Sequence, residues 1–124
     1  MDYLISGISL LALDSVYLSL IKNYFNKQIK KIQGEDIQLN MTATIATYMF
    51  LSFALYYFII KKKASVTDAF YLGLSIYAVY ELTSKAIFKN WSYMTVIIDT
   101  LWGGILFASS TYITKIATKL IKKL

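Results

Sequence analysis

Three acidic residues, Asp14, Glu81 and Asp99, lie in or at the edge of stretches that otherwise have the composition of membrane-spanning helices. A carboxylate in the hydrocarbon core of a bilayer costs about 2.5 kcal/mol or more. Acids at such positions normally face a bundle interior or a water-filled cavity, where they bind cations, carry protons or pair with amines. The three carboxylates therefore mark the place where we expect the function of the chain to lie.

Aromatic residues with hydrogen-bond donors accompany each acid at helical spacing. Tyr17 follows Asp14 at i+3, and Trp102 follows Asp99 at the same interval. In the third stretch, four residues fall on one face at i, i+3, i+4 and i+7: Tyr77, Tyr80, Glu81 and Ser84. Tyrosine hydroxyls and indole N–H groups donate to carboxylates, so the spacing predicts a connected buried network. The predicted ligand-binding residues are Asp14, Tyr17, Tyr77, Tyr80, Glu81, Ser84, Asp99 and Trp102.

Four apolar stretches can carry these residues across a membrane, since a spanning helix needs about 20 mostly apolar residues. They cover residues 3–21, 42–60, 67–84 and 93–113, and the third is short and rich in Tyr and Ser. Apolar residues make up 57% of the chain, and the mean hydropathy is +0.53. The N-terminus lacks the basic region of a signal peptide, so the first stretch should remain as a helix. We predict one transmembrane domain, 1–124.

An amphipathic segment follows the first stretch. Its apolar residues recur at helical spacing, at Ile21, Phe25, Ile29 and Ile32, and lysines occupy the other faces. This pattern predicts an extension at the membrane surface that ends at Gly34. A first helix that simply overruns the bilayer is the alternative. The predicted fold is all-α, an integral membrane four-helix bundle with an amphipathic extension after the first helix.

The three acids converge in depth because successive spans alternate in direction. Asp14 lies a little past the middle of the first span, Glu81 near the end of the third, and Asp99 in the second turn of the fourth. All three are therefore expected in the same half of the membrane. The second span carries no charge and is expected to pack against the other helices and lipid.

Composition excludes several kinds of chemistry. The chain has no Cys and no His, so thiol catalysis, thiolate metal sites and imidazole bases are absent. We predict no cofactor and no catalytic residue, and the sequence leaves open whether a metal binds. The net charge of +6 is carried by lysines that flank the apolar stretches, where they contact lipid headgroups rather than nucleic acid.

Lysine placement gives a weak indication of orientation. With four spans, the two termini and the middle loop share one side, which holds seven lysines against six on the other. The positive-inside rule then favours cytoplasmic termini in a multi-pass membrane protein.

Each acid also has a structural interpretation. Asp14 can be neutral and tie neighbouring helices together, and Glu81 can pair with Lys85 at i+4. Asp99 can complement the dipole at a helix start. The remaining aromatics near the span ends are expected in the interfacial belt rather than in the site. They are Tyr57, Trp91 and Tyr93.

At these residues the chain resembles DUF2177, a family of small bacterial membrane proteins of unknown function with four spans. Three signature stretches carry the resemblance over nearly the whole chain. They are Asp14, Tyr17 and Leu18; Tyr80, Glu81, Leu82, Thr83, Ser84 and Trp91; and Asp99, Trp102 and Gly103. The chain has Tyr17 where the family usually has Trp, and Ser84 where it usually has Asn. The resemblance implies the four-span fold and the polar face, and it implies no biochemical activity.

Three functions fit these observations. The first is an intramembrane site that binds or permeates a small cation, a proton, an amine or a lipid headgroup. The runner-up is a structural or accessory subunit whose acids stabilise helix packing or a partner. The third, a lipid-modifying enzyme, lacks a recognisable acid-rich metal motif. The expected partners are membrane lipids, a small cation or amphipathic ligand, and a second copy of the chain, because four helices make a thin bundle for a complete pathway.

Overall fold

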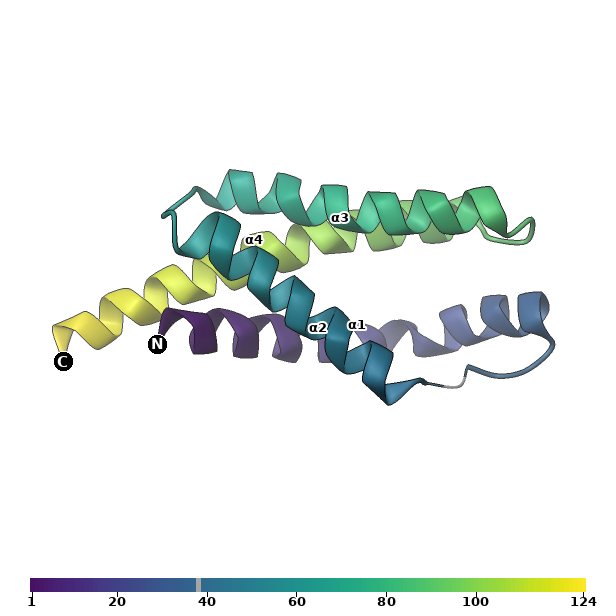
Figure 1. The fold of residues 1–124 in the computed structure, drawn as a ribbon, viewed down its shortest axis with the longest axis horizontal. Coiled ribbons are helices and arrows are strands. Elements are labelled where there is room, and N and C mark those ends of the chain that lie inside the picture. Colours follow the sequence, from purple (N-terminus) through teal and green to yellow (C-terminus); the bar gives the residue numbers. More distant parts are fainter. Residues whose placement is uncertain (38) are drawn as a thin grey trace.

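The computed structural model describes residues 1–37 and 39–124 and is all-α over them, which confirms the predicted fold class. Four α-helices and one short π-helix follow one another along the chain (Figure 1). They are α1 (Asp2–Gln33), α2 (Met41–Leu55), η1 (Tyr56–Ile60), α3 (Val66–Ile87) and α4 (Tyr93–Lys123). Successive helices alternate in direction, and both termini lie at the same end of the molecule.

The amphipathic extension is the last part of one continuous helix. α1 contains 32 residues, which corresponds to about 48 Å at 1.5 Å per residue, longer than a bilayer core of about 30 Å. It ends as expected at Gly34, whose φ of 79° is left-handed and whose N–H donates to the Lys30 carbonyl at 2.8 Å. A left-handed residue at this position closes the last turn of the helix.

The extension packs against the start of α4. The side-chain oxygen of Gln28, a buried residue of α1, accepts hydrogen bonds from the Ser92 backbone N–H at 2.8 Å and the Thr95 hydroxyl at 3.0 Å. The other end of α1 is tied to α4 as well, by a hydrogen bond from Thr118 to Asp2 at 3.0 Å. The two antiparallel helices therefore stay together over most of their lengths.

α4 is the central helix of the bundle. α3 runs along it on one side, and α1 packs on it from another, whereas α1 and α3 make at most marginal contact with each other. The close approach of α3 requires glycine: a Cβ at Gly73 would lie 2.1 Å from the Gly103 carbonyl oxygen, and one at Gly103 would lie 2.3 Å from the Tyr77 ring. Small residues commonly let membrane helices approach in this way.

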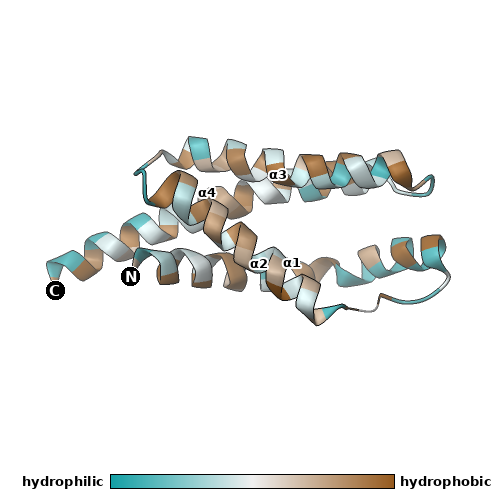
Figure 2. Ribbon diagram, viewed as in Figure 1, coloured by the Kyte–Doolittle hydropathy of each residue, from teal (hydrophilic) through white to brown (hydrophobic). Residues whose placement is uncertain are grey.

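The surface of the bundle is apolar along the helices and polar at its ends. Large apolar side chains are exposed on all four α-helices, whereas most of the helix connections and the C-terminal end are hydrophilic (Figure 2). Within the described residues, three helices are long and apolar enough to cross a membrane: α1, the continuous helix Met41–Ile60, and α4. α3 is not among them, so its assignment as the fourth span remains a prediction.

Candidate functional site

Asp14 is a buried carboxylate that joins three helices. It belongs to α1 and is 5% exposed. The indole N–H of Trp102 in α4 donates to its Oδ1 at 2.9 Å, and the hydroxyl of Tyr48 in α2 donates to its Oδ2. Both carboxylate oxygens therefore have a donor, and each donor comes from a different neighbouring helix.

Asp99 receives its donor from α1. The hydroxyl of Tyr17 donates to Asp99 Oδ1 at 3.1 Å. The rings of Tyr17 and Trp102 stack with centroids 4.5 Å apart and planes 5° from parallel. Each aromatic residue thus bonds the acid of the opposite helix rather than the acid three residues before it. Hydrogen bonds between acids and aromatic donors are formed as expected from the sequence, with their partners exchanged between α1 and α4.

Glu81 is fully buried and bonded to an indole. The N–H of Trp91 donates to Glu81 Oε1 at 3.1 Å, and Trp91 itself is 4% exposed. The expectation that Trp91 lies in the interfacial belt is therefore wrong. No Glu81–Lys85 ion pair forms among the described residues. The Lys85 ammonium instead lies 4.5 Å from the centre of the Tyr93 ring.

Glu81 and Asp99 lie opposite each other across the α3–α4 interface, one helical turn beyond the place where the Tyr77 ring packs on Gly103 of the antiparallel helix. The second oxygen of Glu81, Oε2, is buried and has no hydrogen-bond donor within the described chain. Buried carboxylate oxygens normally have a donor. This oxygen is therefore the conspicuous unsatisfied group of the cluster.

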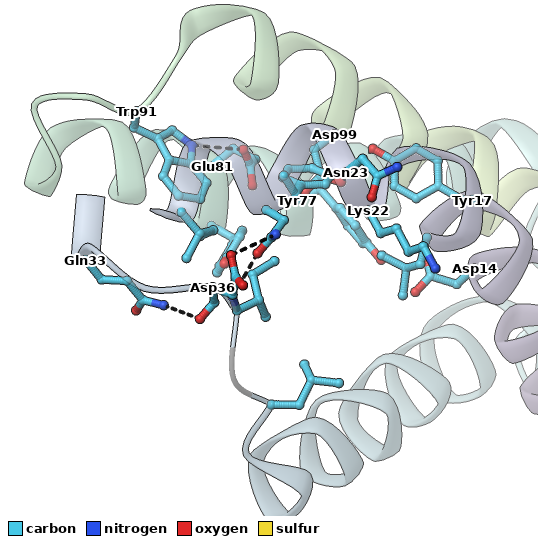
Figure 3. A pocket seen from close by; sticks show the side chains of 17 residues that line it. Asp14, Tyr17, Lys22, Asn23, Gln33, Asp36, Tyr77, Glu81, Trp91 and Asp99 are labelled. Atoms are coloured by element: carbon cyan, nitrogen blue, oxygen red, sulfur yellow. Dashed lines mark hydrogen bonds between the residues drawn. The ribbon is translucent and has the colours of Figure 1, made fainter. Parts of the chain in front are cut away.

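An open cavity of about 810 Å³ has all three acids among its lining residues (Figure 3). Most of its walls come from the second half of α1, from the connection after α1, and from α3. The cavity thus lies between α1 and α3, two helices that make at most marginal contact. The connection folds back along α1, where the Asn26 side chain accepts the Ile37 N–H at 2.8 Å. Lys22 also lines the cavity, but no described lysine lies within salt-bridge distance of Asp14, Glu81 or Asp99.

A family model described as "Predicted membrane protein (DUF2177)" matches residues 1–116. This chain belongs to the DUF2177 family. The resemblance carried by its three motifs is confirmed, and with the three apolar helices it makes the chain a membrane protein. No match is found among curated proteins or among solved structures.

The other predicted site residues of this DUF2177 protein differ in burial and in whether they line the cavity. Tyr77 lines the cavity and packs its ring over Gly103. Tyr80 also lines the cavity but is 60% exposed, so it does not share the buried face of Glu81. Ser84 is buried, and its hydroxyl donates to the Tyr80 carbonyl within α3 at 3.0 Å. Neither Ser84 nor Trp102 is among the residues that line the cavity.

Two residues of the DUF2177 network were missed in the sequence: Tyr48, which bonds Asp14, and Gln28, which bonds the start of α4. Tyr48 shares a helical face with Leu51, Ser52 and Leu55, which are the buried residues of α2. That i, i+3, i+4, i+7 pattern was a usable signal that its hydroxyl points inward.

The arrangement offers carboxylates and aromatic rings rather than a metal cage. Among the described residues, no group of three or more metal-ligating side chains lies close enough to hold an ion together. The donors to the acids are neutral hydroxyl and indole groups. The negative charge of the cluster is therefore not cancelled by a direct ion pair within the described chain.

Proposed function

We propose that this DUF2177 protein binds a small cation, or the ammonium group of an amine or lipid headgroup, at the acids that line the cavity. One observation carries the proposal: three carboxylates line one open cavity, and no described lysine pairs with any of them. An unpaired buried charge is costly in a membrane protein and normally marks a functional site. A bound cation would supply the missing countercharge.

The lining of the cavity favours an organic cation of moderate size. The volume of about 810 Å³ lies within the range of about 300–1,000 Å³ that is usual for small-molecule sites. Tyr17 and Tyr77 present aromatic rings beside the acids, and such rings attract ammonium groups through cation–π contact. Apolar side chains also line the cavity, which suits an amphipathic ligand. They are Leu18, Phe25, Ile29, Ile37 and Leu39.

The test is ligand-dependent thermal unfolding of the purified protein in detergent, with potassium, tetramethylammonium and ethanolamine as probes at constant ionic strength. A specific ligand raises the melting temperature, because it binds only the folded state. We expect this rise in the wild type and its loss in Glu81→Gln and Asp99→Asn. Glu35→Gln is the matched control, since Glu35 is exposed and does not line the cavity.

Lys22 provides a second arm of the test. Its ammonium shares the cavity with the acids and repels a bound cation, so Lys22→Gln should tighten binding. An equal response of the wild type and all four variants to each probe would overturn the proposal. Permeation belongs to the same proposal and would require a homo-oligomer, whose formation crosslinking in native membranes can detect.

A structural role for Asp14 is the second candidate. Its two oxygens already have donors from α2 and α4, so it needs no ligand to be satisfied. On this proposal Asp14 holds α1, α2 and α4 together, and the ligand belongs to Glu81 and Asp99. Asp14→Asn would then lower the melting temperature and leave the ligand-induced rise intact.

A further inference from the structure

We propose that the carboxyl groups of Glu81 and Asp99 hold one proton between them, and that a cation binding in the cavity displaces it. The displacement step rests on the proposed function, whereas the shared proton stands on the geometry of the pair. The inference assigns this site a defined exchange: one proton leaves for each monovalent cation that binds.

The unsatisfied oxygen of Glu81 is the first reason. Glu81 is fully buried, and its Oε2 has no donor among the described residues, although Asp99 lies opposite it across the α3–α4 interface and lines the same cavity. Two ionised carboxylates are both acceptors and cannot bond each other. One proton placed between them turns this contact into an O–H···O⁻ hydrogen bond and gives every oxygen at the contact a role.

Repulsion between the two acids is the second reason. Two carboxylates at such close range do not both ionise readily, and one of them keeps its proton. The other oxygens of the pair have donors that stabilise the remaining negative charge, Tyr17 on Asp99 and Trp91 on Glu81. These two hydrogen bonds can stabilise one negative charge on the pair, whereas Glu81 Oε2 has no donor that would stabilise a second charge.

The surroundings of the pair supply no compensating cation. The titratable groups that face it are Asp14, Tyr17 and Lys22 from α1, Tyr48 from α2 through Asp14, and Tyr77 and Tyr80 from α3. Lys22 is the one described cationic group that lines the cavity, and it does not come within salt-bridge distance of either acid. Asp14, a third carboxylate, lines the same cavity.

Cation binding then has a balanced outcome. A monovalent cation enters the cavity beside the pair, the O–H bond of the protonated carboxyl breaks, and the proton leaves to water. Both carboxylates are then ionised and face the cation. No electron transfer is involved, and the total charge at the site does not change.

Infrared spectroscopy tests the shared proton without any ligand. The carbonyl stretch of a protonated carboxyl is distinct from the carboxylate bands and shifts in D₂O. At neutral pH we expect this band in wild type, Glu35→Gln and Asp14→Asn, and we expect its loss in Glu81→Gln, where the remaining Asp99 can ionise beside a neutral amide. Absence of the band in the wild type, or its persistence in Glu81→Gln and Asp99→Asn alike, would overturn the shared proton.

Proton release tests the exchange. Potassium chloride or tetramethylammonium chloride is mixed with weakly buffered protein that contains a pH indicator. Neither salt binds or releases protons itself. We expect about one proton released per bound cation in the wild type and none in Glu81→Gln. Cation binding without proton release would refute the exchange. If no cation changes the melting temperature, the proposed function fails, and the infrared band still decides the shared proton by itself.

Discussion

The rings of Tyr17 and Trp102 stack 4.5 Å apart, and each residue hydrogen-bonds the acid on the other residue's helix. α1 and α4 are antiparallel, and each contains an acid followed at i+3 by an aromatic donor. The two motifs are therefore related by an approximate local two-fold axis that passes between the stacked rings. This crossed arrangement fixes both the register and the rotation of α1 against α4.

The crossed pair should behave as one unit. Tyr17→Phe removes the donor to Asp99 and keeps a ring for stacking, and Trp102→Phe removes the donor to Asp14. Hydrogen bonds between membrane helices contribute about 0.6 kcal/mol on average and up to about 1.7 kcal/mol. We expect each variant to lose stability in that range and the double variant to deviate from additivity, because the residues are in contact. Unfolding titrations of all four proteins measure the coupling, and strict additivity would contradict it.

Tyr48 should stabilise the protein through its hydroxyl alone. Tyr48→Phe leaves Asp14 Oδ2 without its donor and changes little else. We expect a loss of about 1 kcal/mol or more, since a buried acceptor then lacks a partner. Tyr71→Phe is the control, because Tyr71 lies on the exposed surface of α3. Equal melting temperatures for the two variants would show that the Tyr48–Asp14 contact adds nothing to stability.

Part of this site could be predicted from the sequence. The end of α1 at Gly34 follows from helix-capping chemistry, and the position of the three acids along one cavity follows from alternating helix direction. The choice of donor for each acid could not be predicted in this way. That choice depends on which helices are neighbours and how each is rotated about its axis, and a single apolar stretch encodes neither. For this reason the sequence places Trp91 in the interfacial belt and assigns no role to Tyr48.

The α3–α4 interface should not tolerate a methyl group at Gly73. The added Cβ would overlap the backbone oxygen of Gly103, which cannot move without displacing α4. Overpacking of this kind typically costs about 1–3 kcal/mol. Gly7→Ala is the matched control, since its Cβ would meet Ser52 at an ordinary 3.6 Å. Thermal unfolding should therefore show a much larger decrease for Gly73→Ala, and similar values would place the helices further apart.

The extension of α1 should open locally when Gln28 is shortened. Gln28→Ala removes the acceptor for the Ser92 N–H and the Thr95 hydroxyl. We expect faster hydrogen exchange at the first turn of α4 with little change in overall stability, because the rest of the bundle is untouched. Lys27→Ala, on the exposed side of the same turn, serves as control. Unchanged exchange at Ser92 would mean that the extension lies free of α4.

The chain consists of two helical hairpins, and each contains an acid that already has a hydrogen-bond donor within its own hairpin. Asp14 already has Tyr48 within α1–α2, and Glu81 already has Trp91 within the hairpin of α3 and α4. The contacts of Tyr17 and Trp102 join one hairpin to the other. Each helical hairpin can therefore form with its acid already provided with a hydrogen-bond donor, and the two hairpins can associate afterwards. A chain divided in the turn at residues 61–64 and produced as two fragments retains the contacts that would bring them together.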